Sequence, residues 1–229
     1  MFVCCSLPGR RARRSTLPVV DGSARRERLA RSRLYLVLEA RPHGQDPRPL
    51  LAAALRGGTD IVQLREKALD DAALIAASEP FRGAAREHGA LFVLNDRPDL
   101  VEACGADGVH IGRSDTPVEE ARALVGHERL IGVSASTADE LDELAGADYV
   151  GVTAFATPTK DDAVAGGLEL LRAAARTVAI PWFAIGGIEL SNVAGVAAVG
   201  APGVAVVRAI RDADEPEAAA RTLRERLDR

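Results

Sequence analysis

Two lysines stand out among the 29 basic residues of this chain, because all the others are arginines. Lys67 closes the polar run 63–67, in which Gln63, Arg65 and Lys67 alternate and would share one face of an extended strand. Lys160 closes a second polar run, Thr157-Pro158-Thr159-Lys160. A lysine provides a compact ammonium where a planar guanidinium would not serve. We therefore interpret both runs as anion-binding clusters.

Carboxylates and a hydroxyl in three further runs could complete such a site. Asp96 follows Asn95, and Asp115 lies in the run 110–115. Two carboxylates together with substrate phosphate are a usual environment for Mg²⁺, although each aspartate could instead be a helix cap or a turn residue. Ser134 would join Arg65, Lys67 and Lys160 in donating charge-assisted hydrogen bonds to a polyanion such as pyrophosphate.

The elements that must position these residues follow a simple alternation from Leu34 onward. Short runs rich in Val, Ile and Leu alternate with stretches of helical period. We predict strands at residues 34–38, 60–64, 91–94, 108–111, 130–133, 149–152, 182–185 and 203–207. We predict helices at residues 49–56, 71–88, 98–104, 117–125, 138–145, 168–177, 191–198 and 215–226.

Eight strands, each followed by a helix, predict a single α/β domain of the (β/α)₈ TIM-barrel class over residues 34–229. A doubly wound open sheet is the alternative, since periodicity alone does not prove that a sheet closes. Active sites of such barrels collect at the carboxyl ends of the strands. The polar runs fall there, and Gly186-Gly187 with Val207-Arg208 after the last two strands match the usual phosphate site of this fold.

Composition limits the class of protein further. The chain has 229 residues, of which 47% are hydrophobic and 3% aromatic, so an aliphatic core of substantial size is expected. No stretch approaches the roughly 18–20 apolar residues of a membrane span. Cys4, Cys5 and Cys104 have no metal-ligand spacing with histidine, which suits a reducing cytoplasm. We expect a cytoplasmic enzyme that acts on small molecules and binds neither nucleic acid nor a membrane. The sequence is compatible with a homo-oligomer.

The first 33 residues differ from the rest in charge. They hold nine arginines against Asp21 and Glu27, an excess of +7, which leaves −11 for the remainder of a chain of net charge −4. Such a charge could belong to a nucleic-acid arm or to a targeting segment, but the apolar core of a secretory signal is lacking. We interpret residues 1–33 as a disordered basic extension, or as the product of an early start codon, and expect activity to survive removal of residues 1–30.

The polar clusters, in this order, resemble the thiamine-phosphate synthase (thiamine phosphate pyrophosphorylase) family from Leu34 to about Ile210. Single motifs are common, but the ordered set is specific. It comprises Gln63-x-Arg65-x-Lys67, Asn95-Asp96-Arg97, Asp107-Gly108-Val109-His110 with Asp115, Ile131-Gly132-Val133-Ser134, Asp148-Tyr149-Val150-Gly151-Val152, Thr157-Pro158-Thr159-Lys160 and Ala184-Ile185-Gly186-Gly187-Ile188.

The resemblance implies a transferase of thiamine biosynthesis that joins a hydroxymethylpyrimidine diphosphate to a thiazole phosphate and releases pyrophosphate by a dissociative, Mg²⁺-dependent mechanism. It implies that Asp96 and Asp115 bind the metal, and that Arg65, Lys67, Ser134 and Lys160 act on the leaving group. The substrate-binding residues it implies are Gln63, Leu64, Arg65, Glu66, Lys67, Asn95, Ser134, Thr157, Thr159, Lys160, Gly187, Val207 and Arg208.

Several residues depart from the family pattern. The Gly-Pro-x-Phe-Pro stretch usual before Thr-x-Thr-Lys is replaced by residues 153–156, which are one residue shorter and lack both prolines. Arg113 replaces a usual glutamine and Arg208 a usual serine. A thiazole tautomerase-like enzyme and a non-catalytic barrel that binds thiamine precursors remain alternatives. His110 is interpreted as a satisfied core residue or as the support of another site residue.

Overall fold

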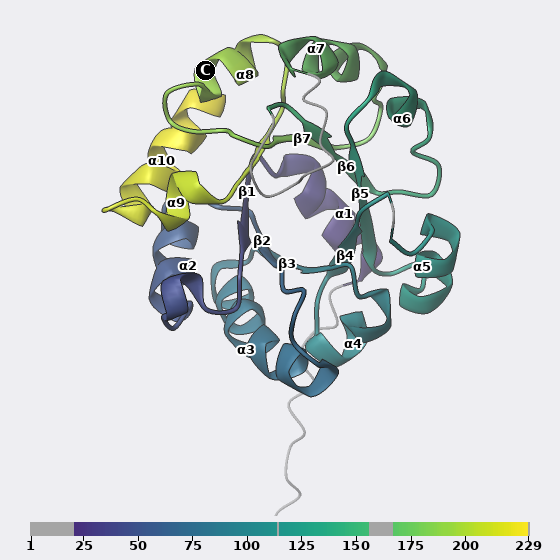
Figure 1. Ribbon diagram of the computed structural model, residues 1–229, viewed down its shortest axis with the longest axis vertical. Helices are drawn as coiled ribbons and strands as arrows, with labels where there is room; N and C mark the ends of the chain where they lie inside the picture. The colour runs from purple at the N-terminus through teal and green to yellow at the C-terminus, as the bar shows by residue number, and fades with distance from the viewer. Residues whose placement is uncertain (1–20, 114, 156–166, 229) are drawn as a thin grey trace, which may run out of the picture.

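Eight parallel strands close into one barrel in the computed structural model, which describes residues 21–113, 115–155 and 167–228 (Figure 1). Neighbours in the barrel are neighbours in the sequence, and β1 pairs with β8 to complete the ring. The strands are β1 (Leu34–Leu38), β2 (Ile61–Leu64), β3 (Leu91–Asn95), β4 (Gly108–Ile111), β5 (Leu130–Ala135), β6 (Tyr149–Thr153), β7 (Trp182–Ile185) and β8 (Val204–Val206).

Helices alternate with the strands and surround the barrel, except α1, which is seen through the middle of the ring in Figure 1. In chain order the described helical segments are α1 (Gly22–Arg31), η1 (Pro42–Gly44), α2 (Arg48–Arg56), α3 (Asp71–His88), η2 (Pro98–Leu100), α4 (Val101–Cys104), α5 (Val118–Val125), α6 (Ala138–Asp142), α7 (Gly167–Thr177), α8 (Val193–Ala198), α9 (Arg208–Arg211) and α10 (Pro216–Leu227). The predicted (β/α)₈ barrel is confirmed, and the pairing of Leu34 with Val204 excludes the open sheet.

The core has two layers because successive side chains of a strand point to opposite faces. In β1, Leu34, Leu36 and Leu38 belong to the outer cluster, which lies between the strands and the helices. Tyr35 and Val37 belong to the inner cluster, which fills the barrel. Both faces of each strand are therefore buried, as the unbroken apolar runs in the sequence indicated.

Helix α1 corrects the interpretation of residues 1–33 as a disordered extension. Asp21 caps its first turn by accepting a hydrogen bond from the amide of Ala24 at 2.8 Å. Leu29 is 2% exposed and belongs to the inner cluster of the barrel. Arg25, also buried, donates to Asp107 at 2.8 Å. Because α1 packs against the inner cluster through an apolar residue and a buried ion pair, the folded domain includes residues 21–33, and the predicted boundary at Leu34 is wrong.

The amino-terminal ends of the strands are tied together by three aspartates, each of which lies two residues after a glycine. Asp60, Asp107 and Asp148 precede β2, β4 and β6, and each accepts a backbone amide of the preceding strand, from Leu34, Phe92 and Ile131 respectively. Each is also paired with an arginine: Arg224, Arg25 and Arg122. This end of the barrel is therefore built for stability, which leaves the carboxyl ends of the strands for chemistry.

Among the described residues, none of the helices combines the length and the apolar character that a membrane crossing requires.

Candidate active site

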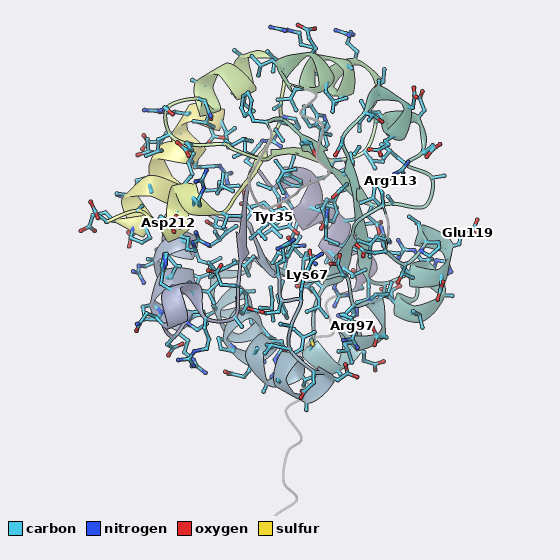
Figure 2. All side chains as sticks on the ribbon, in the orientation of Figure 1. Tyr35, Lys67, Arg97, Arg113, Glu119 and Asp212 are labelled. Atoms are coloured by element: carbon cyan, nitrogen blue, oxygen red, sulfur yellow. The ribbon has the colours of Figure 1, made fainter. Side chains whose placement is uncertain are left out.

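A cavity of about 610 Å³ opens at the carboxyl ends of the barrel strands. Lys67 and Tyr35, both among its lining residues, lie near the middle of the ring in Figure 2. Seven of the sequence-predicted site residues line this one cavity: Gln63, Arg65, Lys67, Asn95, Asp96, Asp115 and Ser134. The strands thus bring together residues that are up to 71 positions apart in the chain.

Adjacent strands β2 and β3 supply two buried amides to the wall of the cavity. Gln63 and Asn95 are 3% and 6% exposed, and the Gln63 side-chain amide donates to Asn95 Oδ1 at 3.3 Å. The Asn95 amide nitrogen has no hydrogen-bond partner within the described residues. A buried donor without a partner is costly, so this group is ready to donate to a substrate.

The turn after β3 directs Asp96 into the cavity. Asp96 has a left-handed backbone (φ 61°), which aspartate tolerates better than most residues. Its amide donates to the carbonyl of His110 at 2.8 Å, and its carboxylate lies 3.7 Å from the Lys67 ammonium. The strained turn fixes this carboxylate at the cavity wall.

Asp96 and Asp115 are neighbours that repel each other as anions. Burial raises the pKa of Asp96, as do the hydrogen bond and the negative charge of Asp115, against the opposing charges of Lys67 and Arg65. Asp115 is held in place by the amide of Gly112, which donates to its Oδ2 at 2.9 Å. Asp96 is half-buried and Asp115 is exposed, and two adjacent carboxylates of this kind are stabilised by a shared cation.

This pair has the donor set that Mg²⁺ prefers. The described residues contain no group of three or more His, Cys, Asp or Glu side chains that could hold a metal ion. Mg²⁺ commonly needs fewer protein ligands, because waters and substrate phosphates complete its octahedron. Asp96 and Asp115 therefore fit Mg²⁺ that arrives with a phosphorylated ligand, and they do not fit a metal held by the protein alone.

His110 and three aromatic residues also line the cavity, although none of them was predicted as a site residue. His110 Nε2 lies 3.0 Å from Ser134 Oγ, so the imidazole orients the hydroxyl, in keeping with the supporting role considered for it. Tyr35, Tyr149 and Phe183 close the cavity from below, with the two phenol oxygens 3.0 Å apart. The sequence did contain a signal for these residues. His110 and the three aromatic residues are large side chains at inward positions of the predicted strands.

A glycine at an inward position makes room for one of these rings. A Cβ added to Gly132 of β5 would lie 2.0 Å from Tyr149 Cζ. One added to Gly151 of β6 would lie 3.5 Å from the His110 ring, an ordinary van der Waals contact. The cavity floor therefore requires glycine at position 132 to accommodate the Tyr149 ring.

Leu64 and Glu66 were also predicted to bind substrate, but their side chains do not line the cavity. Leu64 is fully buried in the outer cluster, on the opposite face of β2 from Gln63. The Glu66 carboxylate accepts the amide of Ala40 at 2.8 Å and so supports the turn after β1. The alternation of a strand explains both positions, because only odd-numbered residues of the run 63–67 face inward.

The residues predicted to bind the second phosphate, Gly186, Gly187, Val207 and Arg208, are not among the residues that line the cavity. Gly186 and Gly187 have positive φ angles of 98° and 61° and pack against Phe155, whose backbone a Cβ on Gly186 would strike at 2.6 Å. Val207 precedes α9, the short helix after β8, and Arg208 opens it. Arg208 lies on the surface with its guanidinium 3.5 Å from Glu189.

The remaining predicted residues, Thr157, Thr159 and Lys160, lie outside the described residues. Arg113, the substitution noted above, pairs with Glu140 and Glu143. It thus links the turn that carries Asp115 to the α6 region, away from the centre of the cavity.

The fold and the site together define a (β/α)₈ barrel whose carboxyl-end cavity combines cationic side chains with two carboxylates, as in proteins that handle phosphorylated small molecules. Comparison with known proteins is more specific. Residues 34–210 match the family model for thiamine monophosphate synthase. The chain therefore belongs to the thiamine monophosphate synthase family, a family of transferases.

Named relatives cover nearly all of the chain. A thiamine-phosphate synthase of Thermobifida fusca is 47% identical over 88% of this chain and 95% of its own length. One of Nostoc sp. is 42% identical over 91% of this chain, but this chain spans only 59% of that longer relative. The solved thiamine phosphate pyrophosphorylase of Pyrococcus furiosus superposes with a TM-score of 0.79 at 34% identity, covering 89% of this chain and 97% of that one.

Proposed function

We propose that this protein is a Mg²⁺-dependent thiamine-phosphate synthase of the cytoplasm. It would join a hydroxymethylpyrimidine diphosphate to a thiazole phosphate, giving thiamine phosphate and pyrophosphate. The observation that carries the proposal is the convergence of Arg65, Lys67, Asp96, Asp115 and Ser134 on one cavity in a member of this family.

The reaction needs one bond to break and one to form. The C–O bond between the pyrimidine methylene and the diphosphate breaks, and its electron pair leaves with pyrophosphate. The thiazole nitrogen then donates its lone pair to the methylene cation, forming the C–N bond. No proton needs to move, which agrees with a cavity whose imidazole is directed at the Ser134 hydroxyl.

Stabilisation of the leaving group is the main task of the side chains. Arg65, Lys67 and the hydroxyl of Ser134 would donate charge-assisted hydrogen bonds to the departing pyrophosphate. Lys160 would join them by the family resemblance. Mg²⁺, bound by Asp96 and Asp115 together with the diphosphate, would neutralise part of its charge.

The two amides and the aromatic floor suit the pyrimidine. Gln63 and Asn95, whose amide nitrogen has no partner among the described residues, would present donors and acceptors at the cavity wall to the ring heteroatoms. Tyr149 and Phe183 present apolar ring faces below them. Gly187, Val207 and Arg208, with Thr157 and Thr159, would bind the thiazole phosphate on the other side of the rim.

The test is pyrophosphate release measured with both substrates, with each alone, and with or without Mg²⁺. We expect turnover only with both substrates and the metal. Turnover of a thiazole compound without pyrimidine or Mg²⁺ would instead indicate a tautomerase, and binding without turnover would indicate a non-catalytic barrel.

Two variants test the site within this assay. Asp96→Asn removes one charge but keeps a residue that tolerates the left-handed turn, and we expect turnover to fall by about 100-fold or more, as when one transition-state contact is lost. Lys160→Ala should have a similar effect. Glu119→Gln, on the exposed face of α5 far from the cavity (Figure 2), is the control and should keep full activity. Equal rates in Asp96→Asn and the control would refute the assignment.

A further inference from the structure

A second hollow, of about 490 Å³, lies at the opposite end of the barrel from the candidate active site. Its lining residues directly precede β1, β2 and β3, so it sits at the amino-terminal ends of these strands. Helix α1 forms one wall with its last turn, and the end of α3 forms another. The residues that line it are Arg28, Arg31, Ser32, Thr59, Asp60, His88, Gly89 and Ala90.

Basic side chains outnumber acidic ones around this hollow. Within the part of the chain that the structure describes, the side chains of Arg28 and His88 make no hydrogen bond or ion pair. Arg31 donates from Nε to the carbonyl of Glu27 at 3.2 Å, and its guanidinium lies 3.6 Å from the Glu27 carboxylate, an exposed ion pair that binds weakly in water. Arg28 and His88 therefore keep their donors available for a ligand, and Arg31 keeps those that Glu27 does not use.

The one carboxylate in the lining is already engaged. Asp60 Oδ2 accepts the amides of Arg33 and Leu34 and the guanidinium of Arg224 at 2.6 Å. The last carbonyls of α1 are likewise occupied, because Ser32 donates to Arg28 and Leu29 through its hydroxyl and its amide. Because Asp60 is paired with Arg224 and the α1 carbonyls accept from Ser32, neither offsets the positive charge of Arg28 and Arg31 in full.

A buried hydroxyl gives a second and independent indication of a ligand. Thr59 lines the hollow and is 5% exposed, and its Oγ1 has no hydrogen-bond partner among the described residues. Leaving a buried hydroxyl unpaired costs about 1–3 kcal/mol. An anion seated beside it would supply the missing acceptor.

We propose that this hollow is a second oxyanion site, suited to a phosphate group and separate from the candidate active site. Arg28, Arg31 and His88 would donate to its oxygens, and the Thr59 hydroxyl would donate from below. The hollow is concave and has room for inorganic phosphate or for a small phosphate monoester. This inference does not depend on the proposed function, since the two sites share no lining residue.

The experiment is a titration of the full-length protein with inorganic phosphate, followed residue by residue in amide NMR spectra, with potassium chloride at matched ionic strength as the reference. We expect saturable shifts at Thr59, Gly89 and Ala90. The amides of Asn95 and Ser134 report separately on the candidate active site, so binding at either site can fail alone. Absence of saturable shifts at Thr59, Gly89 and Ala90 would overturn the proposal.

Variants assign the binding to these side chains. Arg28→Gln should weaken phosphate binding at the hollow by about tenfold or more, whereas Arg86→Ala, which removes the same charge from the exposed face of α3, should leave it unchanged. An equal effect of both would show general charge attraction and refute the site.

Thr59→Val separates a role of this hydroxyl in phosphate binding from a role in stability alone. Because the hydroxyl has no described partner, its removal should leave urea stability equal or higher while weakening phosphate binding. Lost stability with unchanged binding would contradict the proposed role. Repeating the titration with glycerol 3-phosphate distinguishes the two sources, since a site for monoesters should bind it more tightly than free phosphate.

Discussion

At the scale of single residues, the chemistry of the site was largely readable from spacing. The alternation of Gln63, Arg65 and Lys67 placed them on one face, and all three line the cavity. Leu64 and Glu66 entered the prediction only through the family resemblance, and the same alternation turns their side chains away. His110 was harder, because an inward histidine on an apolar strand looks the same in sequence whether it fills the core or contacts a site residue.

The burial of the Cys104 thiol predicts its reactivity. Cys104 is fully buried at the end of α4, and burial raises the pKa of its thiol, against smaller opposing effects of Ser78 and Arg82. We expect iodoacetamide to leave Cys104 unmodified in the folded protein at mildly alkaline pH and to alkylate it after unfolding. Peptide mass spectrometry, which separates Cys104 from Cys4 and Cys5, checks this.

The same shift predicts the pH dependence of stability. A thiol with a raised folded-state pKa contributes stability that is full below the ordinary thiol pKa and is lost as pH rises through the raised value. The free energy of unfolding should therefore fall more steeply above the ordinary thiol pKa in the native chain than in Cys104→Ala. Parallel profiles, or rapid alkylation of the folded protein, would contradict the burial of this thiol.

At the scale of elements, α1 is a helix whose high charge kept it from being predicted from the sequence. Its sequence is rich in arginine and resembles a solvated tail, but Arg25 and Leu29 are four residues apart and share a face that meets the barrel. Their partners, Asp107 and the inner cluster, lie far along the chain. Only the tertiary structure pairs Arg25 and Arg26 of α1 with the aspartates that precede β4 and β6.

This packing predicts that α1 is needed for stability. Arg25→Ala leaves Asp107 without its buried partner and should lower the free energy of unfolding by about 3–5 kcal/mol. Leu29→Ala should cost about 2–5 kcal/mol. Urea denaturation measures both.

Truncations provide the matched comparison. Removal of residues 1–20 keeps the Asp21 cap and should leave stability unchanged, whereas removal of residues 1–30 deletes nearly all of α1 and should destabilise the protein strongly. Equal stability of the two truncated chains would restore the original interpretation of the basic extension.

At the scale of the whole molecule, the barrel separates two kinds of function between its ends. Aspartate–arginine pairs and α1 hold the amino-terminal end, and the carboxyl end gathers the cationic and acidic residues of the cavity. The proposed oxyanion site occupies part of the first end. A ligand at either end stabilises the folded molecule in proportion to its affinity.

Thermal unfolding therefore tests the proposed metal site without turnover. Because Asp96 and Asp115 are too few to hold Mg²⁺ alone, we expect Mg²⁺ and pyrophosphate together to raise the Tm more than the sum of their separate effects. At about 100-fold excess over Kd the gain is about 2.7 kcal/mol, or roughly 5–10 °C for a chain of this size. Asp96→Asn should lose this joint effect, and its persistence there would place the metal elsewhere.

The sequence by itself determined the order of strands and helices from Leu34 onward and the polar runs that follow the strands, because both depend on local periodicity and residue type. Tertiary structure alone decided that the sheet closes through β1 and β8, that α1 joins the core, and that His110 faces Ser134. The physical reason is that these outcomes depend on contacts between residues distant in the chain. The residue pattern of a segment identifies its apolar face, and only the packing of the folded chain identifies the residues that this face contacts.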